Sequence, residues 1–167
     1  MLDDDIADAA KGLLDICIAK KLSIATAESC TAGLVAGALT EIPGSSAVVD
    51  RGFVTYSNQA KHEMLGVRND TLTAHGAVSR QTAEAMVRGV LGHSKVDLAV
   101  SITGIAGPGG GSADKPVGLV HFAAATRDGH RLHREKRYGD IGRGPVRMRS
   151  VAEALAMIEL LATGGRI

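Results

Sequence analysis

Aromatic residues are scarce in this chain of 167 residues, which has two Phe, two Tyr and no Trp. A hydrophobic core must therefore be built mainly from Ala, Val, Leu and Ile. Cysteine is scarce too, since only Cys17 and Cys30 are present, with neither a CxxC pair nor a Cys/His ligand spacing. We interpret both as reduced thiols, which are typical of a cytoplasmic protein.

An excess of charge of one sign is also absent. Nineteen Lys and Arg residues against 18 Asp and Glu leave a formal net charge of +1, which disfavours general nucleic-acid binding. No run approaches the roughly 20 apolar residues that a membrane span needs. The first residues, 1–5, are acidic where a signal peptide would be basic. We therefore expect a cytoplasmic protein with no nucleic-acid or membrane partner.

Glycine and aliphatic residues are plentiful. The chain has 21 Gly and is 45% hydrophobic and 22% charged, which is typical of a globular protein. Its length fits one domain, and no internal repeat or interdomain linker interrupts it. The sequence therefore predicts a single domain over residues 1–167.

Apolar residues recur at steps of three and four in several segments, which predicts amphipathic helices. Helices are expected over 2–21, 31–42, 79–91 and 146–162, with a short helix capped at Ser57-Asn58 that carries Lys61. Strands are expected over 23–27, 47–56, 97–103, 117–126 and 130–138, the last two joined by a hairpin turn at Asp128-Gly129. Helices alternate with strands before the hairpin, so we expect an α/β fold, a three-layer α/β/α sandwich on a mixed sheet.

Polar residues follow the first expected strand, at the kind of strand end where open α/β sheets bind ligands. Ser29 lies where this strand turns into a helix, so its hydroxyl would lie beside helical amides that can hold an oxyanion or a phosphate. The alternative is an ordinary helix N-cap. Cys30 is a rival nucleophile, but we expect its thiol to point into the helix packing.

Lys61 follows the second strand end, which carries Tyr56. A lysine with the usual pKa of about 10.4 is almost fully charged at pH 7 and cannot accept a proton. Burial in a cleft would lower this pKa and make Lys61 a general base for a serine. The alternatives are a solvated lysine and a Tyr56 that is merely amphipathic at the core edge, rather than a hydrogen-bond relay.

The third strand end runs into a glycine-rich loop over 104–112, which has few side chains and would contact a ligand through backbone amides. It matches neither a P-loop nor a dinucleotide fingerprint, and the alternative is a flexible surface loop.

Three arginines, Arg143, Arg147 and Arg149, lie in the first turns of the last expected helix, where the helix dipole disfavours positive charge. They would therefore contact an anion, either a substrate phosphate or the carboxylates of a neighbouring subunit. The six histidines have no metal-ligand spacing, so we expect no metal.

Taken together, these segments resemble the CinA C-terminal domain family over about residues 5–162. The resemblance rests on five blocks in order: 26–33, 44–46, 51–58 with Lys61, 76–79, and 104–108 with 115–118. This family is associated with nicotinamide mononucleotide amidohydrolase activity, which releases ammonia and leaves nicotinate mononucleotide for pyridine nucleotide recycling. The family also occurs fused behind a molybdopterin-binding-like domain, which this sequence does not show, so we expect the stand-alone form. The short Gly-rich chain with arginines at the start of its last helix leads us to expect a homo-oligomer.

The resemblance implies a metal-independent and cofactor-free site in which Ser29 is the nucleophile, Lys61 the base and Tyr56 a helper. The phosphate would lie against the loop at Gly104 or against 44–46, with Arg143 or Arg147. The substrate-binding residues expected are Cys30, Thr31, Gly33, Gly44, Ser45, Ser46, Thr103, Gly104, Ala106, Gly107, Arg143 and Arg147.

The sequence departs from the family pattern in two places. Ala32 stands where the family usually has glycine, and the segment 141–145 is longer than usual. Ser45 and Ser46 remain alternative nucleophiles.

A catalytically silent pyridine-nucleotide-binding or interaction module is the main alternative function. Hydrolysis of another small amide or lactam is a third, which the lack of a Ser-x-x-Lys spacing disfavours.

Overall fold

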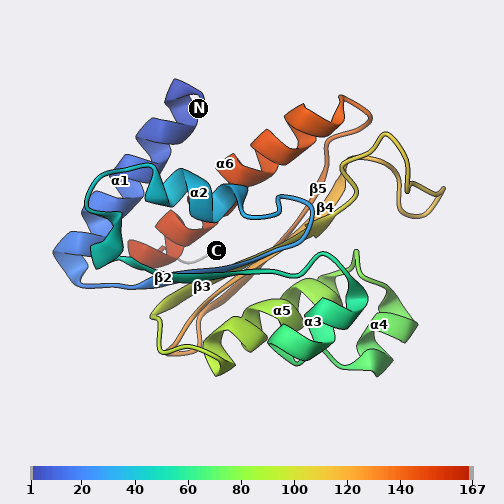
Figure 1. The fold of residues 1–167 in the computed structure, drawn as a ribbon, viewed down its shortest axis with the longest axis horizontal. Helices are drawn as coiled ribbons and strands as arrows, with labels where there is room; N and C mark the ends of the chain where they lie inside the picture. The colour runs from blue at the N-terminus through green and yellow to red at the C-terminus, as the bar shows by residue number, and fades with distance from the viewer. Residues whose placement is uncertain (1, 166–167) are drawn as a thin grey trace.

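Five strands form one mixed sheet in the order β2-β1-β3-β4-β5, in a computed structural model that describes residues 2–165 (Figure 1). The central strand β1 (Ile24–Glu28) pairs in parallel with β2 (Val49–Val54) and with β3 (Leu98–Gly104). Antiparallel pairing then joins β3 to β4 (Leu119–Thr126) and β4 to β5 (Arg131–Arg137). The expected strands and the late hairpin are confirmed.

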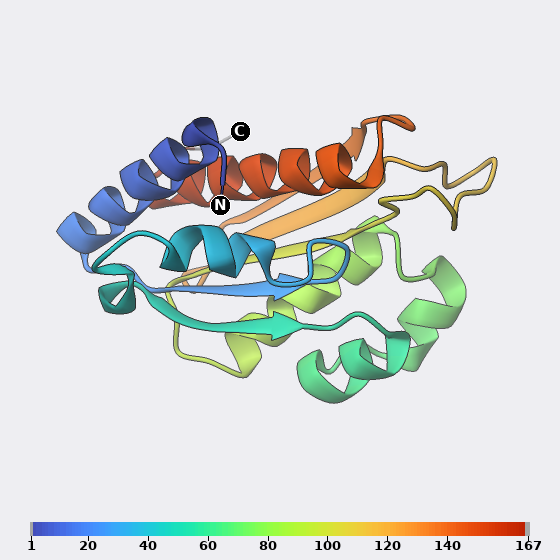
Figure 2. The same ribbon diagram turned by 45° about the horizontal axis from the view of Figure 1, so that its top comes forward.

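Helices cover both faces of this sheet, which confirms the three-layer sandwich (Figure 1 and Figure 2). One face carries α1 (Asp4–Lys20), α2 (Leu34–Thr40) and α6 (Arg143–Ala162). Their apolar sides pack on aliphatic residues of β1 and β3 and on the fully buried Phe122 of β4. The scarcity of aromatic side chains thus leads to a largely aliphatic core.

The other face carries α3 (Asn58–Leu65), α4 (Asn69–His75) and α5 (Arg80–Gly92). The expected cap at Ser57 is confirmed, because its hydroxyl accepts a hydrogen bond from the amide of Ala60. Ser79, where the next helix is expected to begin, is the cap of α5 and accepts a hydrogen bond from the amide of Thr82. The sequence analysis did not predict α4. This helix buries only Leu72, so it has no apolar periodicity to detect.

The expected start of the second helix at residue 31 is wrong, because α2 begins at Leu34 after a turn. Ala32 and Gly33 have φ values of 46° and 96°, and such left-handed residues cannot continue a right-handed helix. A short 3-10 helix, η1 (Ser45–Ala47), follows α2 and leads into β2. No helix within residues 2–165 is both long and apolar enough to cross a membrane.

The connections place the carboxyl ends of β1, β2 and β3 at one edge of the sheet. The chain passes from β1 to β2 through α2 on one face, and from β2 to β3 through α3, α4 and α5 on the other. The end of β1 is therefore a topological switch point, where open α/β sheets form ligand-binding crevices.

Candidate active site

Ser29 and Lys61 meet at this edge of the sheet. Ser29 directly follows β1, and its Oγ accepts a hydrogen bond of 3.1 Å from Lys61 Nζ. The same Nζ donates to the carbonyl oxygen of Thr55 at 2.7 Å. Thr55 is itself anchored beside β1, because its amide donates to the carbonyl of Glu28 at 2.9 Å. Residues 32 positions apart are thus brought into contact by the parallel pairing of β1 and β2.

The Lys61 amine is buried, and its side chain is only 1% exposed. No carboxylate lies within 4 Å of it among residues 2–165. Burial lowers the pKa of Lys61 from the usual 10.5 to about 8, against a smaller opposing effect of Cys30. At pH 7 about a tenth of the amine is then neutral and able to accept a proton.

Glu28, a carboxylate just before Ser29, caps α2. Its side chain is 1% exposed, and its two oxygens accept hydrogen bonds from the amides of Val35 at 2.9 Å and Ala36 at 3.1 Å. These first helical amides are therefore already paired. The expectation that amides at the helix start hold an oxyanion is not supported, because Glu28 occupies them.

The turn between Ser29 and α2 offers other donors. Its amides at Ser29, Ala32 and Leu34 donate to backbone carbonyls. Those of Cys30 and Thr31 have no acceptor within residues 2–165, although both residues are buried. The buried Thr31 hydroxyl has no hydrogen-bond partner there either. Buried donors are usually paired, and Cys30 lines the cleft whereas Thr31 does not, so an oxygen atom of a ligand beside Ser29 would find the unpaired N–H of Cys30.

A cleft of about 260 Å³ opens at Ser29 and Lys61. Half of the residues expected to bind substrate line it, and the glycine-rich loop after β3 forms one wall. The lining residues are Ser29, Cys30, Tyr56, Lys61, Ala77, Val78, Thr103, Gly104, Ile105, Ala106, Gly107, Gly109, Gly110 and Arg143.

Arg143 spans the mouth of this cleft. Its guanidinium donates to the carbonyl of Gly107 and to the phenol oxygen of Tyr56, each at 3.0 Å. Tyr56 is 61% exposed and makes no hydrogen bond to Ser29 or Lys61 within the described residues, so the structure places it at the cleft mouth rather than in the Ser29–Lys61 pair. Arg143 has no carboxylate partner within 4 Å in the described chain, so it can bind an anion.

Thr31 is fully buried and does not line the cleft, and Arg147 and Gly33 lie behind the turn rather than in the cleft lining. Arg147 donates from Nε to the carbonyl of Cys30 at 3.0 Å and from Nη2 to the carbonyl of Thr31 at 3.4 Å. Gly33 packs near Val54, and its φ of 96° suits glycine. Both residues therefore shape the turn.

Gly44, Ser45 and Ser46 lie at the opposite edge of the sheet from Ser29. They precede β2, whose first residue pairs with Ile24 at the start of β1. Ser29 follows the other end of this five-residue strand, about 16 Å away at about 3.3 Å per residue. The structure does not bring these three residues to the cleft, so we leave them out of the site.

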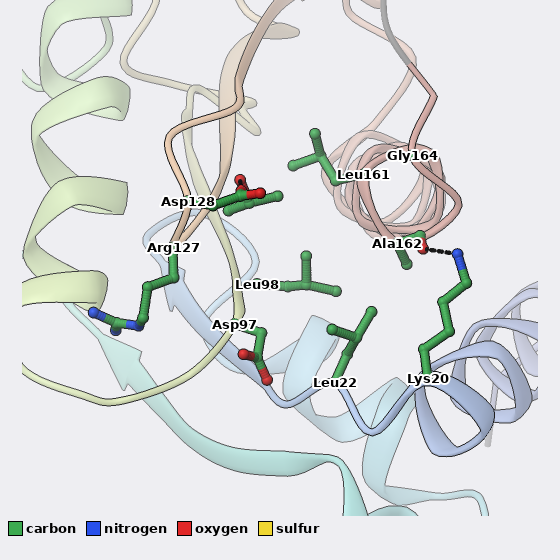
Figure 3. A pocket seen from close by; sticks show the side chains of 10 residues that line it. Lys20, Leu22, Asp97, Leu98, Arg127, Asp128, Leu161, Ala162 and Gly164 are labelled. Carbon is green, nitrogen blue, oxygen red and sulfur yellow. Dashed lines mark hydrogen bonds between the residues drawn. The ribbon is translucent and has the colours of Figure 1, made fainter.

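A larger cavity of about 640 Å³ lies near the amino ends of β1 and β3, away from Ser29 (Figure 3). Its charged side chains are engaged within the fold: Lys20 donates to the carbonyl of Ala162, Asp97 accepts from Ser23, and Arg127 donates to three carbonyls after and within α5. The fourth charged side chain, Asp128, accepts a hydrogen bond from the hydroxyl of Thr126, which also lines this cavity. Within residues 2–165, no three His, Cys, Asp or Glu residues are grouped to hold a metal ion.

Comparisons with known proteins agree with the fold and the motifs. The family model described as CinA C-terminal domain matches residues 6–162. The nicotinamide-nucleotide amidohydrolase PncC of Escherichia coli (strain K12) is 47% identical over 93% of each chain. A putative competence-damage inducible protein of Caldicellulosiruptor bescii is 58% identical over 65% of this chain, but the match spans only 26% of that relative. The crystal structure of competence/damage inducible protein CihA from Agrobacterium tumefaciens is 58% identical, with a TM-score of 0.95 over 96% of this chain and 98% of that one.

Proposed function

The chain belongs to the CinA C-terminal domain family, and on that premise we propose that it hydrolyses nicotinamide mononucleotide to nicotinate mononucleotide and ammonia. The observation that carries this proposal is the buried Lys61 amine in hydrogen-bond contact with the Ser29 hydroxyl. The names of relatives such as the Escherichia coli amidohydrolase support the substrate class. The contacts of the described residues support a serine–lysine mechanism.

The first step is activation of Ser29. A neutral Lys61 amine donates one hydrogen to the Thr55 carbonyl, which leaves its lone pair facing the Ser29 hydroxyl. The amine takes the hydroxyl proton while Ser29 Oγ attacks the carboxamide carbon of the nicotinamide group. A lysine suits this role because burial has already lowered its pKa to about 8.

The second step is loss of ammonia. The negative oxygen of the tetrahedral intermediate is stabilised by the unpaired amide of Cys30, which borders the cleft. Protonated Lys61 returns its proton to the leaving nitrogen, the C–N bond breaks, and an acyl-serine remains. Lys61 then takes a proton from water, whose oxygen attacks the acyl carbon. The bond from this carbon to Ser29 Oγ breaks, protonated Lys61 returns the proton to Oγ, and nicotinate mononucleotide and free Ser29 result. No step in this sequence requires a metal or a cofactor.

Substrate contacts follow from the cleft. We assign the phosphate to Arg143, because this cation borders the cleft and its two partners are neutral groups. A phosphate would bind a guanidinium more strongly than a phenol or a peptide carbonyl does. The backbone of the glycine-rich loop at Gly104–Gly107 would contact the pyridine carboxamide or the ribose.

Ammonia release from nicotinamide mononucleotide by the purified protein in the presence of a chelator tests this function. We expect turnover by the wild type and losses of at least 100-fold in Ser29→Ala and Lys61→Ala. Ser46→Ala is the matched control, because this exposed serine lies at the far edge of the sheet and should leave turnover unchanged. Full turnover by Ser29→Ala with loss in Ser45→Ala would contradict our choice of nucleophile. Binding of the nucleotide without turnover by the wild type would instead support a silent binding module.

A further inference from the structure

The three arginines at the start of α6 have different surroundings. Arg143 borders the cleft and bonds Tyr56 and Gly107, whereas the exposed Arg149 side chain makes no hydrogen bond within residues 2–165. Arg147 is half-buried, and its guanidinium bonds two consecutive carbonyls, those of Cys30 and Thr31. No carboxylate lies within 4 Å of Arg147 among the described residues. The dipoles of these two peptide groups are therefore the main stabilisation of its positive charge.

These bonds hold the two peptide units that follow Cys30. The Cys30 carbonyl and the Thr31 amide belong to one planar trans peptide unit, so they point in opposite directions. Because Arg147 holds this carbonyl from the α6 side, the Thr31 N–H points away from α6. The next peptide unit is held at both ends, since Arg147 bonds the Thr31 carbonyl and the amide of Ala32 donates to Ser29 O at 3.0 Å.

We propose that Arg147 is a positioning residue, which holds the turn after Ser29 so that the amide of Cys30, a residue that lines the cleft, faces the oxygen on which charge develops. This inference rests on the proposed acyl-transfer chemistry of Ser29. The turn needs such support because it contains Ala32 in a left-handed conformation. A rotated Cys30–Thr31 peptide would turn the Cys30 carbonyl toward the cleft that Cys30 lines, where it would repel the oxyanion.

A contact between Arg147 and the substrate phosphate is the competing role, and the geometry disfavours it. Arg147 does not line the cleft, and it would have to release the turn in order to reach a ligand. The two roles have different kinetic signatures. Loss of a phosphate contact raises KM, whereas loss of an oriented amide lowers kcat because the interaction forms only in the transition state.

The test compares Arg143→Met, Arg147→Met and Arg149→Met, three equivalent changes on one helix. With nicotinamide mononucleotide, we expect Arg147→Met to lower kcat about 10- to 100-fold with KM within about twofold of the wild type. Arg149→Met should match the wild type, and Arg143→Met should mainly raise KM. Arg147→Lys, which keeps the charge but cannot bond both carbonyls as a fork, should recover part of the lost kcat. A raised KM with normal kcat in Arg147→Met would overturn the proposal, as would unchanged kinetics.

A second readout does not depend on the natural substrate. An alkyl fluorophosphonate reacts with an activated serine: a bond forms between Ser29 Oγ and phosphorus, the P–F bond breaks, fluoride leaves, and Lys61 takes the serine proton. Mass spectrometry of the modified protein measures the rate, which we expect to fall about 10-fold or more in Arg147→Met and to stay unchanged in Arg149→Met.

The two readouts separate the inference from the proposed function. Arg147-dependent phosphonylation in a wild type that releases no ammonia would reject the nucleotide substrate and keep the role of Arg147. Normal turnover by the wild type, with equal phosphonylation rates in wild type and Arg147→Met, would keep the nucleotide substrate and reject the role of Arg147. A wild-type Ser29 that does not react at all would overturn both. Should Arg147→Met fail to fold by circular dichroism, Arg147→Lys provides the same comparison, with a lowered kcat and an unchanged KM expected.

Discussion

Gly89 of α5 lies directly against the backbone of Leu65, the last residue of α3. A Cβ atom at Gly89 would overlap the Leu65 carbonyl oxygen and lie 2.7 Å from its Cβ. The helix that ends at Leu65 is the one that carries Lys61. The close approach of these two helices therefore determines where the catalytic amine of the proposed mechanism lies.

Gly89→Ala should consequently both destabilise the protein and impair the site. We expect a loss of about 1–3 kcal/mol in the free energy of unfolding, because the added methyl group overpacks the contact. Turnover should fall as well, since α3 must move away from α5 and take Lys61 with it. Urea unfolding and ammonia release measure the two effects.

Gly12→Ala is the control for this change. Gly12 lies inside α1 with open space around the position of a Cβ. Alanine is the better helix former there, so Gly12→Ala should stabilise by about 0.5–1 kcal/mol with normal turnover. If Gly89→Ala behaved in the same way, the helix contact would not control the position of Lys61.

The rate should depend on pH through Lys61. Its pKa of about 8 means that the neutral, proton-accepting form increases as pH rises through 8. We expect kcat/KM to rise about tenfold per pH unit below this value and to level off above it. Lys61→Arg should be nearly inactive at every pH, because a guanidinium does not act as a base. A wild-type profile that is flat between pH 6 and 9 would argue against Lys61 as the base.

The stability of the protein should also depend on pH through Lys61. The pKa is lowered on folding from 10.5 to about 8, so between these values the unfolded chain binds a proton that the folded chain does not. The free energy of unfolding should therefore gain a contribution as pH rises from 8 to 10.5 and lose it as pH falls back through 8. The free energy of unfolding of wild type and of Lys61→Met, measured in urea at pH 7.5 and 9.5, isolates this contribution, because all other groups titrate in both proteins. Equal pH dependence in the two proteins would show that Lys61 is not desolvated.

Ala32→Gly should stabilise the protein. Ala32 is exposed and has a φ of 46°, a left-handed conformation that costs an L-residue with a Cβ roughly 1–2 kcal/mol. Glycine avoids that cost but gains freedom in the unfolded chain, so the net gain should be about 0.5–1 kcal/mol. Thermal unfolding measures the change. A lower melting temperature in Ala32→Gly would mean that the methyl group makes a stabilising contact that outweighs the backbone strain.

Local sequence signals predicted most of the secondary structure, and they failed where tertiary contacts decide. The cap at Ser57 and the start of a helix at Ser79 are predicted from the sequence because capping uses residues within one turn. The start of α2 was misplaced because its cap is the carboxylate of Glu28, which belongs to the preceding strand. A side chain that caps from seven residues upstream leaves no local pattern. The expected homo-oligomer and the cytoplasmic location stay predictions.

The sequence by itself determined the alternation of helices and strands, the late hairpin and the polar strand ends, because periodicity and turn residues act over a few positions. It also singled out Ser29 and Lys61. Only the tertiary structure decided that these two residues touch, that Arg147 bonds the turn after Ser29, and that Ser45 lies at the far edge of the sheet. These relationships depend on the order and direction in which distant strands pair, and strand pairing is set by packing of the whole chain rather than by neighbouring residues.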